Sequence, residues 1–349
     1  MATSSQPKIV NGVLEDADLK SASLAGTSFT GIKFKRVNFT NADLSDADLG
    51  NAQFEACVFD GANLAGAKMA LATFQACSMK TANLSNADLS VATLTQVDLS
   101  GAQAQSLNCS ASLLDGCTLD QADLQSANMN CTRIKGGSLN GTLLQKADLT
   151  RLMILEIDAS TAVFGQNDMS QAMLMKAALA GQQFPDCNLT LTLFIEADLQ
   201  GANFAGASLS QTQFTKARLK GANFSQATAN IVNFALADLT AADLTNAKFE
   251  MCEFSHATLN SVRANGSQWH ATSMLNVQAV QSVWDNAELD LCDLSHAKFD
   301  QASARNASLS ICNLHALSEE GTVWDGARFN DTLHTDPARE KAENWQTPL

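Results

Sequence analysis

A large apolar residue recurs at every fifth position along most of this chain, and this period restricts the possible folds more than any other feature. The segment from Glu196 to Ser210 reads EADLQ GANFA GASLS, with Leu or Phe fourth in each unit. In an α-helix five residues turn about 500°, so successive large residues would scatter around the cylinder. In a strand they would alternate between opposite faces, because five is odd. A chain that bends once per unit brings them to a common interior, so the period predicts a solenoid of stacked coils.

The register of this period continues without a break. Counting in fives from Leu199, the centre of its unit, reaches Leu14 toward the N-terminus and Phe329 toward the C-terminus. All 17 Phe residues occupy centres, and most of the 19 Gly residues fall two positions after a centre, where a corner needs a permissive backbone. The residue two positions before each centre is usually small. The sequence therefore predicts a single elongated repeat domain.

The units ADLSD ADLGN from Ala42 and ADLTA ADLTN from Ala237 carry an A(D/N)LXX motif, and this motif resembles the pentapeptide-repeat protein family. The resemblance implies an all-β fold, a right-handed quadrilateral β-helix with four units per coil and about 16 coils. It also implies that each centre and the small residue before it point inward.

The repeat boundaries suggest a flexible N-terminus over residues 1–7, a β-helix over residues 8–333 and a C-terminal cap over residues 334–349. We expect the segment from Lys8 to Gly12 to form the first strand. Asp336 is suited to cap a short helix with Pro337 in its first turn, and Trp345 is expected to pack on the last coil. Glu319 falls on an inward position, which predicts a weakened coil near this end.

No residue pattern in the sequence points to catalysis, a cofactor or a metal ion. The five His residues fall on outward positions or beyond the repeats, and most of the nine Cys residues take the small inward position, which favours buried structural thiols. Lys and Arg total 22 against 36 Asp and Glu, which gives a net charge of -14 and argues against binding nucleic acid directly. The polar N-terminal segment and the lack of a long apolar run lead us to expect a cytoplasmic, bacterial protein without membrane association.

Departures from the repeat indicate a candidate binding surface. The outward positions beside the centres Ile154, Leu174 and Phe194 carry apolar residues, where most coils carry polar ones. The adjoining corner column, read at steps of twenty, is also rich in apolar residues. It runs Leu71, Val91, Ala111, Cys131, Arg151, Gln171, Leu191, Gln211, Ile231, Met251, Ala271, Leu291 and Ile311. The residues that we predict to bind a partner, called the apolar seam below, are Met153, Leu155, Met173, Met175, Leu191, Leu193, Ile195, Ile231 and Met251.

Three interpretations of the apolar seam are compatible with the sequence. A local slip of register between Thr132 and Thr192, where the inward residues are irregular, would turn Met153 or Leu155 inward. A chain terminus folded over the seam would cover it. An interface with a protein partner or a second copy is the interpretation we prefer, because large exposed apolar patches usually mark contacts.

The sequence therefore favours a non-enzymatic protein-interaction scaffold that binds a protein partner or itself, a dimer included. The family resemblance also allows a bacterial secretion-associated accessory role. Some family members imitate DNA and bind DNA gyrase or another type II topoisomerase, so a DNA mimic is the first alternative, which the acidic surface allows. A structural spacer is the second.

Overall fold

Residues twenty positions apart in the sequence lie side by side, which confirms four five-residue units per coil. In the first coils Leu14 pairs in parallel with Phe34, and Phe34 pairs with Phe54. The computed structural model describes residues 9–155, 157–343 and 345, so the predicted flexible segment 1–7 lies outside the described residues. The fold is an all-β parallel solenoid of about 16 turns with one short helix near the C-terminus, as predicted. The chain divides into two compact units, Met1–Ala178 and Leu179–Leu349, called unit 1 and unit 2 below.

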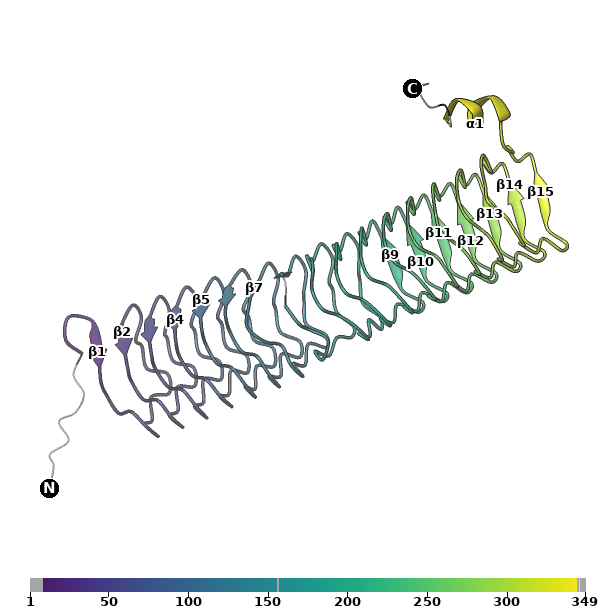
Figure 1. The fold of residues 1–349 in the computed structure, drawn as a ribbon. Coiled ribbons are helices and arrows are strands. Elements are labelled where there is room, and N and C mark those ends of the chain that lie inside the picture. Colours follow the sequence, from purple (N-terminus) through teal and green to yellow (C-terminus); the bar gives the residue numbers. More distant parts are fainter. Residues whose placement is uncertain (1–8, 156, 344, 346–349) are drawn as a thin grey trace. The chain divides into compact units, whose positions relative to one another are not determined.

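Unit 1 contains one parallel sheet of eight short strands that follow one another in sequence order (Figure 1). The strands are β1 (Val13–Glu15), β2 (Lys33–Lys35), β3 (Gln53–Glu55), β4 (Thr73–Gln75), β5 (Thr93–Thr95), β6 (Leu113–Asp115), β7 (Arg133–Lys135) and β8 (Met153–Leu155). The central residue of each strand is buried, and the rings of Phe34, Phe54 and Phe74 stack at 4.9 and 4.6 Å between centroids. The apolar period thus becomes a column of core side chains.

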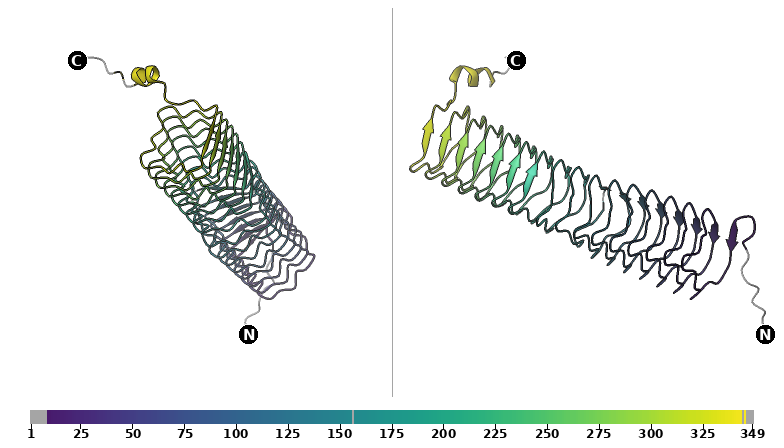
Figure 2. Two further views of the ribbon diagram at one scale, coloured as in Figure 1. Left: turned by 90° about the vertical axis from the view of Figure 1, so that its right-hand side faces the viewer. Right: turned by 180° about the vertical axis from the view of Figure 1, so that it is seen from behind.

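Unit 2 contains a parallel sheet of seven strands, again in sequence order, followed by a helix. The strands are β9 (Ser208–Ser210), β10 (Thr228–Asn230), β11 (Lys248–Glu250), β12 (Gln268–His270), β13 (Glu288–Asp290), β14 (Ser308–Ser310) and β15 (Arg328–Asn330), and the helix is α1 (Pro337–Glu343). Phe249 and Trp269 stack at 4.1 Å in its core. Two further views show α1 turned back beside the last coils of this unit (Figure 2). No helix among the described residues is long and apolar enough to cross a membrane.

The corner of nearly every unit is a single residue in the left-handed region of φ, at the position where the sequence pattern places Gly. Most corners are closed by a backbone hydrogen bond in which the residue after the corner donates its N–H to the carbonyl three residues earlier. At the corner Ser21, for example, Ala22 N–H donates to the oxygen of Leu19 at 3.0 Å. Among the described residues, no bond of this kind closes the corners that directly follow the strands β1 to β7 and β9 to β15, which we call bend corners. At several bend corners a buried thiol in the next coil donates to the strand's central carbonyl, as Cys57 Sγ does to Phe34 at 3.6 Å and Cys252 Sγ to Ala229 at 3.5 Å.

Burial raises the pKa of Cys117 to about 11 and that of Cys252 to about 11, so these two thiols stay protonated and able to donate. Cys57 with Cys77, and Cys292 with Cys312, interact on adjacent coils as expected from their spacing. All nine Cys residues are free thiols.

The N-terminal edge differs from the expectation. The chain pairs Val10 back onto Val13 in antiparallel orientation, and the first parallel strand begins only at Val13. The reason is the dipeptide Asn11-Gly12, whose φ values of 50° and 75° form the tight turn that this dipeptide favours in β-hairpins. The prediction of a strand from Lys8 to Gly12 was therefore wrong for the described part of that segment. The hairpin covers part of a strand edge that would otherwise stay unpaired.

The C-terminal end agrees with the expectation in part. Asp336 accepts hydrogen bonds from the backbone N–H groups of Ala338 and Arg339 at 2.8 and 3.3 Å, so it caps α1 as predicted. Glu319 is exposed, which confirms the weakened coil. Trp345 is 67% exposed, so the prediction that it packs on the last coil was wrong. The helix lies beside the coils and is held there by Glu343, which leaves Trp345 in solvent.

Candidate functional site

In unit 1 the apolar seam keeps the outward register that the sequence predicted. Met153 and Met173 pair as parallel neighbours, and Ile154 N–H donates to the carbonyl of Met173 at 2.8 Å. Ile154 is buried, whereas Met153 is partly exposed and Leu155 is 38% exposed. Met173 and Met175 are also partly exposed on either side of a buried centre. The alternation excludes a register slip that turns these four side chains into the core.

In unit 2 the remaining seam residues also lie outward. Leu191 is 39% exposed, Leu193 and Ile195 are partly exposed, and Ile231 and Met251 are each 48% exposed. Ile231 and Met251 directly follow the paired strands β10 and β11, so they occupy neighbouring coils. Gln211 separates the coil of Leu191 from that of Ile231. Met153, Leu155, Met173 and Met175 belong to unit 1, and the other five seam residues belong to unit 2.

The same corner column continues beyond the predicted seam in unit 2. Leu291 and Ile311 are 47% and 56% exposed. The apolar ridge of unit 2, as we call this column, consists of Leu191, Ile231, Met251, Leu291 and Ile311. The column was already visible in the sequence at steps of twenty, although the predicted seam ended at Met251.

The backbone of the apolar ridge is unusual for apolar residues. Ile231, Met251, Leu291 and Ile311 have φ values of 55°, 49°, 55° and 54°. Left-handed backbone disfavours residues with a bulky Cβ, and β-branched Ile most of all, whereas Gly, Asn and Asp adopt it at lower energy. Local stability alone therefore does not account for apolar side chains at these exposed corners.

A shallow groove of about 530 Å³ lies beside the apolar ridge, and we call it the polar groove because most of the residues that line it are polar. It runs over the outward face of β9 to β13, and β10, β11 and β13 end directly before the ridge residues Ile231, Met251 and Leu291. Polar side chains pair along it from coil to coil: Asn230 donates to Glu250 at 3.0 Å, and His270 lies 2.9 Å from Asp290. The sequence analysis did not predict this groove, because single polar residues on an outward face give no signal of a concave surface.

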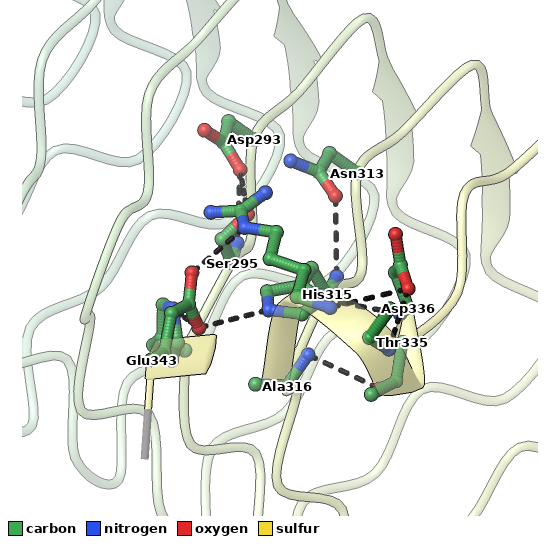
Figure 3. A network of polar contacts seen from close by, with 11 residues as sticks. Asp293, Ser295, Asn313, His315, Ala316, Thr335, Asp336 and Glu343 are labelled. Atoms are coloured by element: carbon green, nitrogen blue, oxygen red, sulfur yellow. Dashed lines mark hydrogen bonds and ion pairs between the residues drawn. The ribbon is translucent and has the colours of Figure 1, made fainter. Parts of the chain in front are cut away.

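A second site lies under α1, where the sequence analysis expected no metal-ligand cluster. His296, His315 and Glu343 bring their ligating atoms within 4.8 Å of one another. Figure 3 shows the contact between His315 and Glu343. His315 was predicted to be outward and is nevertheless 2% exposed, because the segment that leads into α1 covers it. Hydrogen bonds from His315 and then from Arg339 lower the pKa of Glu343, so its carboxylate is ionised at neutral pH. Only the path of the C-terminal segment could have revealed this cluster.

Comparison with known proteins identifies the repeat. The family described as "Pentapeptide repeat region" matches residues 27–104 and 47–129, and the family described as "Pentapeptide repeats (8 copies)" matches residues 192–228, 232–268 and 281–316. Together these matches cover more than half of the chain. A search of curated proteins finds no match.

Solved structures of pentapeptide repeat proteins are similar to this chain at low overall scores. HetL of the cyanobacterium Nostoc sp. strain PCC 7120, involved in heterocyst differentiation regulation, is 18% identical, with 86% of this chain and 91% of HetL covered and a TM-score of 0.24. Full-length QnrB1, a plasmid-mediated fluoroquinolone resistance protein, is 14% identical, with 90% and 93% covered and a TM-score of 0.13. A thylakoid-lumen protein of Arabidopsis thaliana is 28% identical, with 29% and 64% covered and a TM-score of 0.22. These scores are too low to transfer a function, but the family matches are sufficient: the chain belongs to the pentapeptide-repeat family.

Proposed function

We propose that this protein is a non-enzymatic interaction scaffold that binds a protein partner through exposed apolar side chains. The observation that carries the proposal is the apolar ridge of unit 2. Its side chains are about half exposed and stand on left-handed backbone that Gly or Asn would adopt at lower energy. Violations of local preference of this kind are expected at functional surfaces.

The energetics indicate that the ridge acts together with other contacts. Burying a large aliphatic side chain completely contributes about 1.5–3 kcal/mol, so the exposed half of each ridge residue contributes about 1 kcal/mol. Association costs at least about 4 kcal/mol in lost translational and rotational freedom. The ridge by itself therefore supports weak binding, and the polar groove beside it supplies the hydrogen bonds that orient a partner. The exposed apolar side chains of unit 1 offer a second contact of the same chemistry.

The proposal is tested by replacing ridge residues with residues that suit the backbone. The variant Ile231→Asn with Met251→Asn removes apolar surface without disturbing the left-handed corners, so we expect folding to persist. Sedimentation velocity of the purified protein, and cross-linking in cells from a photoreactive residue at Leu291, measure self-association and partner capture. We expect the double variant to lose at least tenfold in affinity.

A matched control exists at another corner of unit 2. Leu236 is 52% exposed with a φ of 61°, and it lies outside the ridge. Leu236→Asn should leave self-association and partner capture unchanged. Equal behaviour of the wild type, the double variant and this control would contradict the proposal and favour a structural spacer.

The alternative of DNA mimicry has less support from the surface charges. Acidic side chains are paired with basic side chains on neighbouring coils: Arg218 lies 3.2 Å from Asp198, and Lys80 lies 3.1 Å from Asp98. A surface that imitates two phosphate rows needs uninterrupted negative charge. A gyrase supercoiling assay titrated with the purified protein distinguishes the two, because inhibition or protection by the double ridge variant as well as the wild type would favour the mimic.

A further inference from the structure

Three side chains with ligating atoms converge where α1 meets the coils of unit 2. His296 and His315 come from neighbouring coils, and Glu343 is the last residue of α1. The carboxylate oxygen Oε2 of Glu343 lies 3.0 Å from Nε2 of His315 and 3.3 Å from Nε2 of His296. The other carboxylate oxygen, Oε1, accepts a hydrogen bond from Arg339 Nε at 2.7 Å. Arg339 therefore fixes the carboxylate so that one oxygen faces both imidazoles.

The local fold places these groups independently of one another. His296 stands on a left-handed corner with a φ of 57°, which aims its ring away from the core. The hydroxyl of Thr335 accepts the Ala316 N–H at 3.1 Å, and this contact fixes the chain just before α1. The cap residue Asp336 then starts the helix that carries Glu343 back toward the two rings.

The geometry matches the coordination sphere of a tetrahedral ion. With ligand bonds of about 2.0–2.1 Å and a tetrahedral angle, ligating atoms lie about 3.3 Å apart, and two imidazole centroids lie about 5.2 Å apart. In this cluster the two nitrogen–oxygen distances are 3.0 and 3.3 Å, and all three ligating atoms lie within 4.8 Å of one another. The ring centroids of His296 and His315 are 5.3 Å apart, with the rings at 86°. Two nitrogen ligands and one carboxylate suit Zn²⁺ and similar transition metals, whereas Mg²⁺ and Ca²⁺ prefer oxygen ligands alone.

We propose that His296, His315 and Glu343 bind one divalent transition-metal ion of the Zn²⁺ class, with water as the fourth ligand, and that the ion fastens α1 to the coils of unit 2. Arg339 serves as the outer partner that orients the ligating carboxylate. The helix is seven residues long and has no buried residue, so side-chain contacts at its last turn largely determine whether it stays docked.

Metal binding would change the hydrogen bonds that His315 makes. The backbone N–H of Asp336 lies 3.2 Å from Nδ1 of His315 and donates to it. An ion on Nε2 would displace the ring proton that Nε2 shares with Glu343, and the ring would carry its proton on Nδ1 instead. That proton would face the Asp336 N–H, so the long hydrogen bond from this N–H to Nδ1 would be lost. A cluster held only by hydrogen bonds would instead keep this contact in every condition.

The test uses the full-length protein stripped with a chelator, with Zn²⁺ and Co²⁺ as probes. Competition against a chromophoric chelator should give one Zn²⁺ per chain, and Co²⁺ should give the intense visible bands of a tetrahedral site. Each of His296→Asn, His315→Asn and Glu343→Gln should weaken Zn²⁺ binding at least tenfold. The control His256→Asn changes another exposed His on a left-handed corner, with a φ of 61°, and should leave the affinity unchanged.

A second measurement does not depend on the folding of any variant. Arg339 and Lys341 are trypsin sites within α1, so Zn²⁺ should slow cleavage there at least fivefold in the wild-type protein and excess chelator should reverse the effect. Sub-stoichiometric binding, binding that the His256→Asn control weakens as much as the ligand variants do, or cleavage that Zn²⁺ does not change would each overturn the proposal. The last outcome would indicate a clamp made of hydrogen bonds alone.

Discussion

The strands of unit 1 and unit 2 occupy different five-residue units of the coil, although the register of the repeat is the same in both. In unit 1 each strand begins two residues after the corner column that contains Leu71 and Val91. In unit 2 each strand ends just before the corresponding column, which contains Ile231 and Met251. The described residues between β8 and β9 form turns and isolated bridges without a named strand. The period of five therefore does not determine which side of the coil forms the paired strands.

What the two ladders share is the residue that follows the bend corner. Most corners of the repeat are followed by Ala, but the bend corners are followed mainly by Cys, Val or Thr. These residues are Val37, Cys57, Cys77, Val97 and Cys117 in unit 1, and Thr212, Val232, Cys252, Thr272, Cys292, Cys312 and Thr332 in unit 2. A β-branched side chain favours extended backbone, and a thiol or hydroxyl can donate to a carbonyl that the open corner leaves without its turn partner. The residue type at this one position, called the marked position below, therefore indicates which side of the coil carries the paired strands.

The strongest challenge to this rule comes from Gly137, which takes the marked position after β7. A Cβ on Gly137 would lie 1.8 Å from the carbonyl oxygen of Cys117, and the φ of this residue is +84°. Because the obstacle is backbone, we expect Gly137→Ala to lower the free energy of unfolding by about 3 kcal/mol or more. Urea denaturation measures the loss, and hydrogen exchange of the β7 amides shows whether it is local.

The neighbouring glycine provides the control. A Cβ on Gly136 would meet nothing closer than 3.9 Å, so Gly136→Ala should cost only the strain of its left-handed φ, about 1 kcal/mol. Equal losses for the two variants would show that this corner can relax to the arrangement of the other coils.

A smaller effect tests the marked position in both units at once. Cys117 and Cys252 are buried, and their thiols donate to Leu94 and Ala229 at 3.4 and 3.5 Å. Replacement of either by Ala removes volume and a donor and should cost about 1–2 kcal/mol. Replacement by Val, which other bend corners already carry, should cost less than about 1 kcal/mol. Thermal unfolding of the four variants measures this, and Ala tolerated as well as Val would refute the rule.

Much of the fold could be predicted from the sequence because every five-residue unit follows the same pattern. A large residue at each centre and a small or polar residue at each corner determine what lies inward and what turns, as the buried Leu14 and Leu309 show near the two ends of the register. The face of the strands could have been predicted as well. The marked Cys residues were recognised as inward and stacked, but they were considered equivalent to Ala, and the donor that distinguishes a thiol was overlooked.

The candidate sites were predictable to different degrees. The apolar ridge is a column at steps of twenty and needs only the register. The contact of His315 with Glu343 joins a repeat residue to a segment outside the repeat, and it depends on the hydrogen bonds of Thr335 and Asp336, which no period encodes. The exposed position of Trp345 has the same origin. Non-local contacts of an irregular terminus are the part that a repeat pattern leaves open.

The corners of the apolar column allow a finer comparison of the two units. Val91 stands on a corner closed by the bond from Ala92 N–H to the oxygen of Leu89 at 3.1 Å, whereas Ile231 stands on an open bend corner. Both have left-handed φ values, 58° and 55°. Replacing either by Asn should raise the free energy of unfolding by about 0.5 kcal/mol, since Asn adopts this backbone more readily and little buried surface is lost. A gain at Val91 alone, measured by urea denaturation, would show that bend corners impose no strain on their side chains.

The smallest expected effect concerns an Asp that occurs at the same place in both units but has a different partner on the next coil in each. Asp43 in unit 1 accepts hydrogen bonds from Ser45 and from Asn63, whereas Asp243 at the same place in unit 2 pairs with Arg263. The bonds from Ser45 lower the pKa of Asp43 below its ordinary value of 3.8, so the stabilisation it contributes is present above pH 3.8 and is lost as the pH falls through the lowered value. Asp43→Asn keeps an acceptor for the Ser45 N–H, as Asn63 does for Ala65 at 3.3 Å, and should lower the urea midpoint only slightly at pH 7. At pH 3 the wild type should have lost part of its advantage over this variant. A difference in urea midpoint between the two proteins that stays constant from pH 7 to pH 2 would contradict this prediction. It would mean that the hydrogen bonds from Ser45 do not favour the ionised form of Asp43, so that a carboxylate and an amide at this position give unit 1 the same stability in acid.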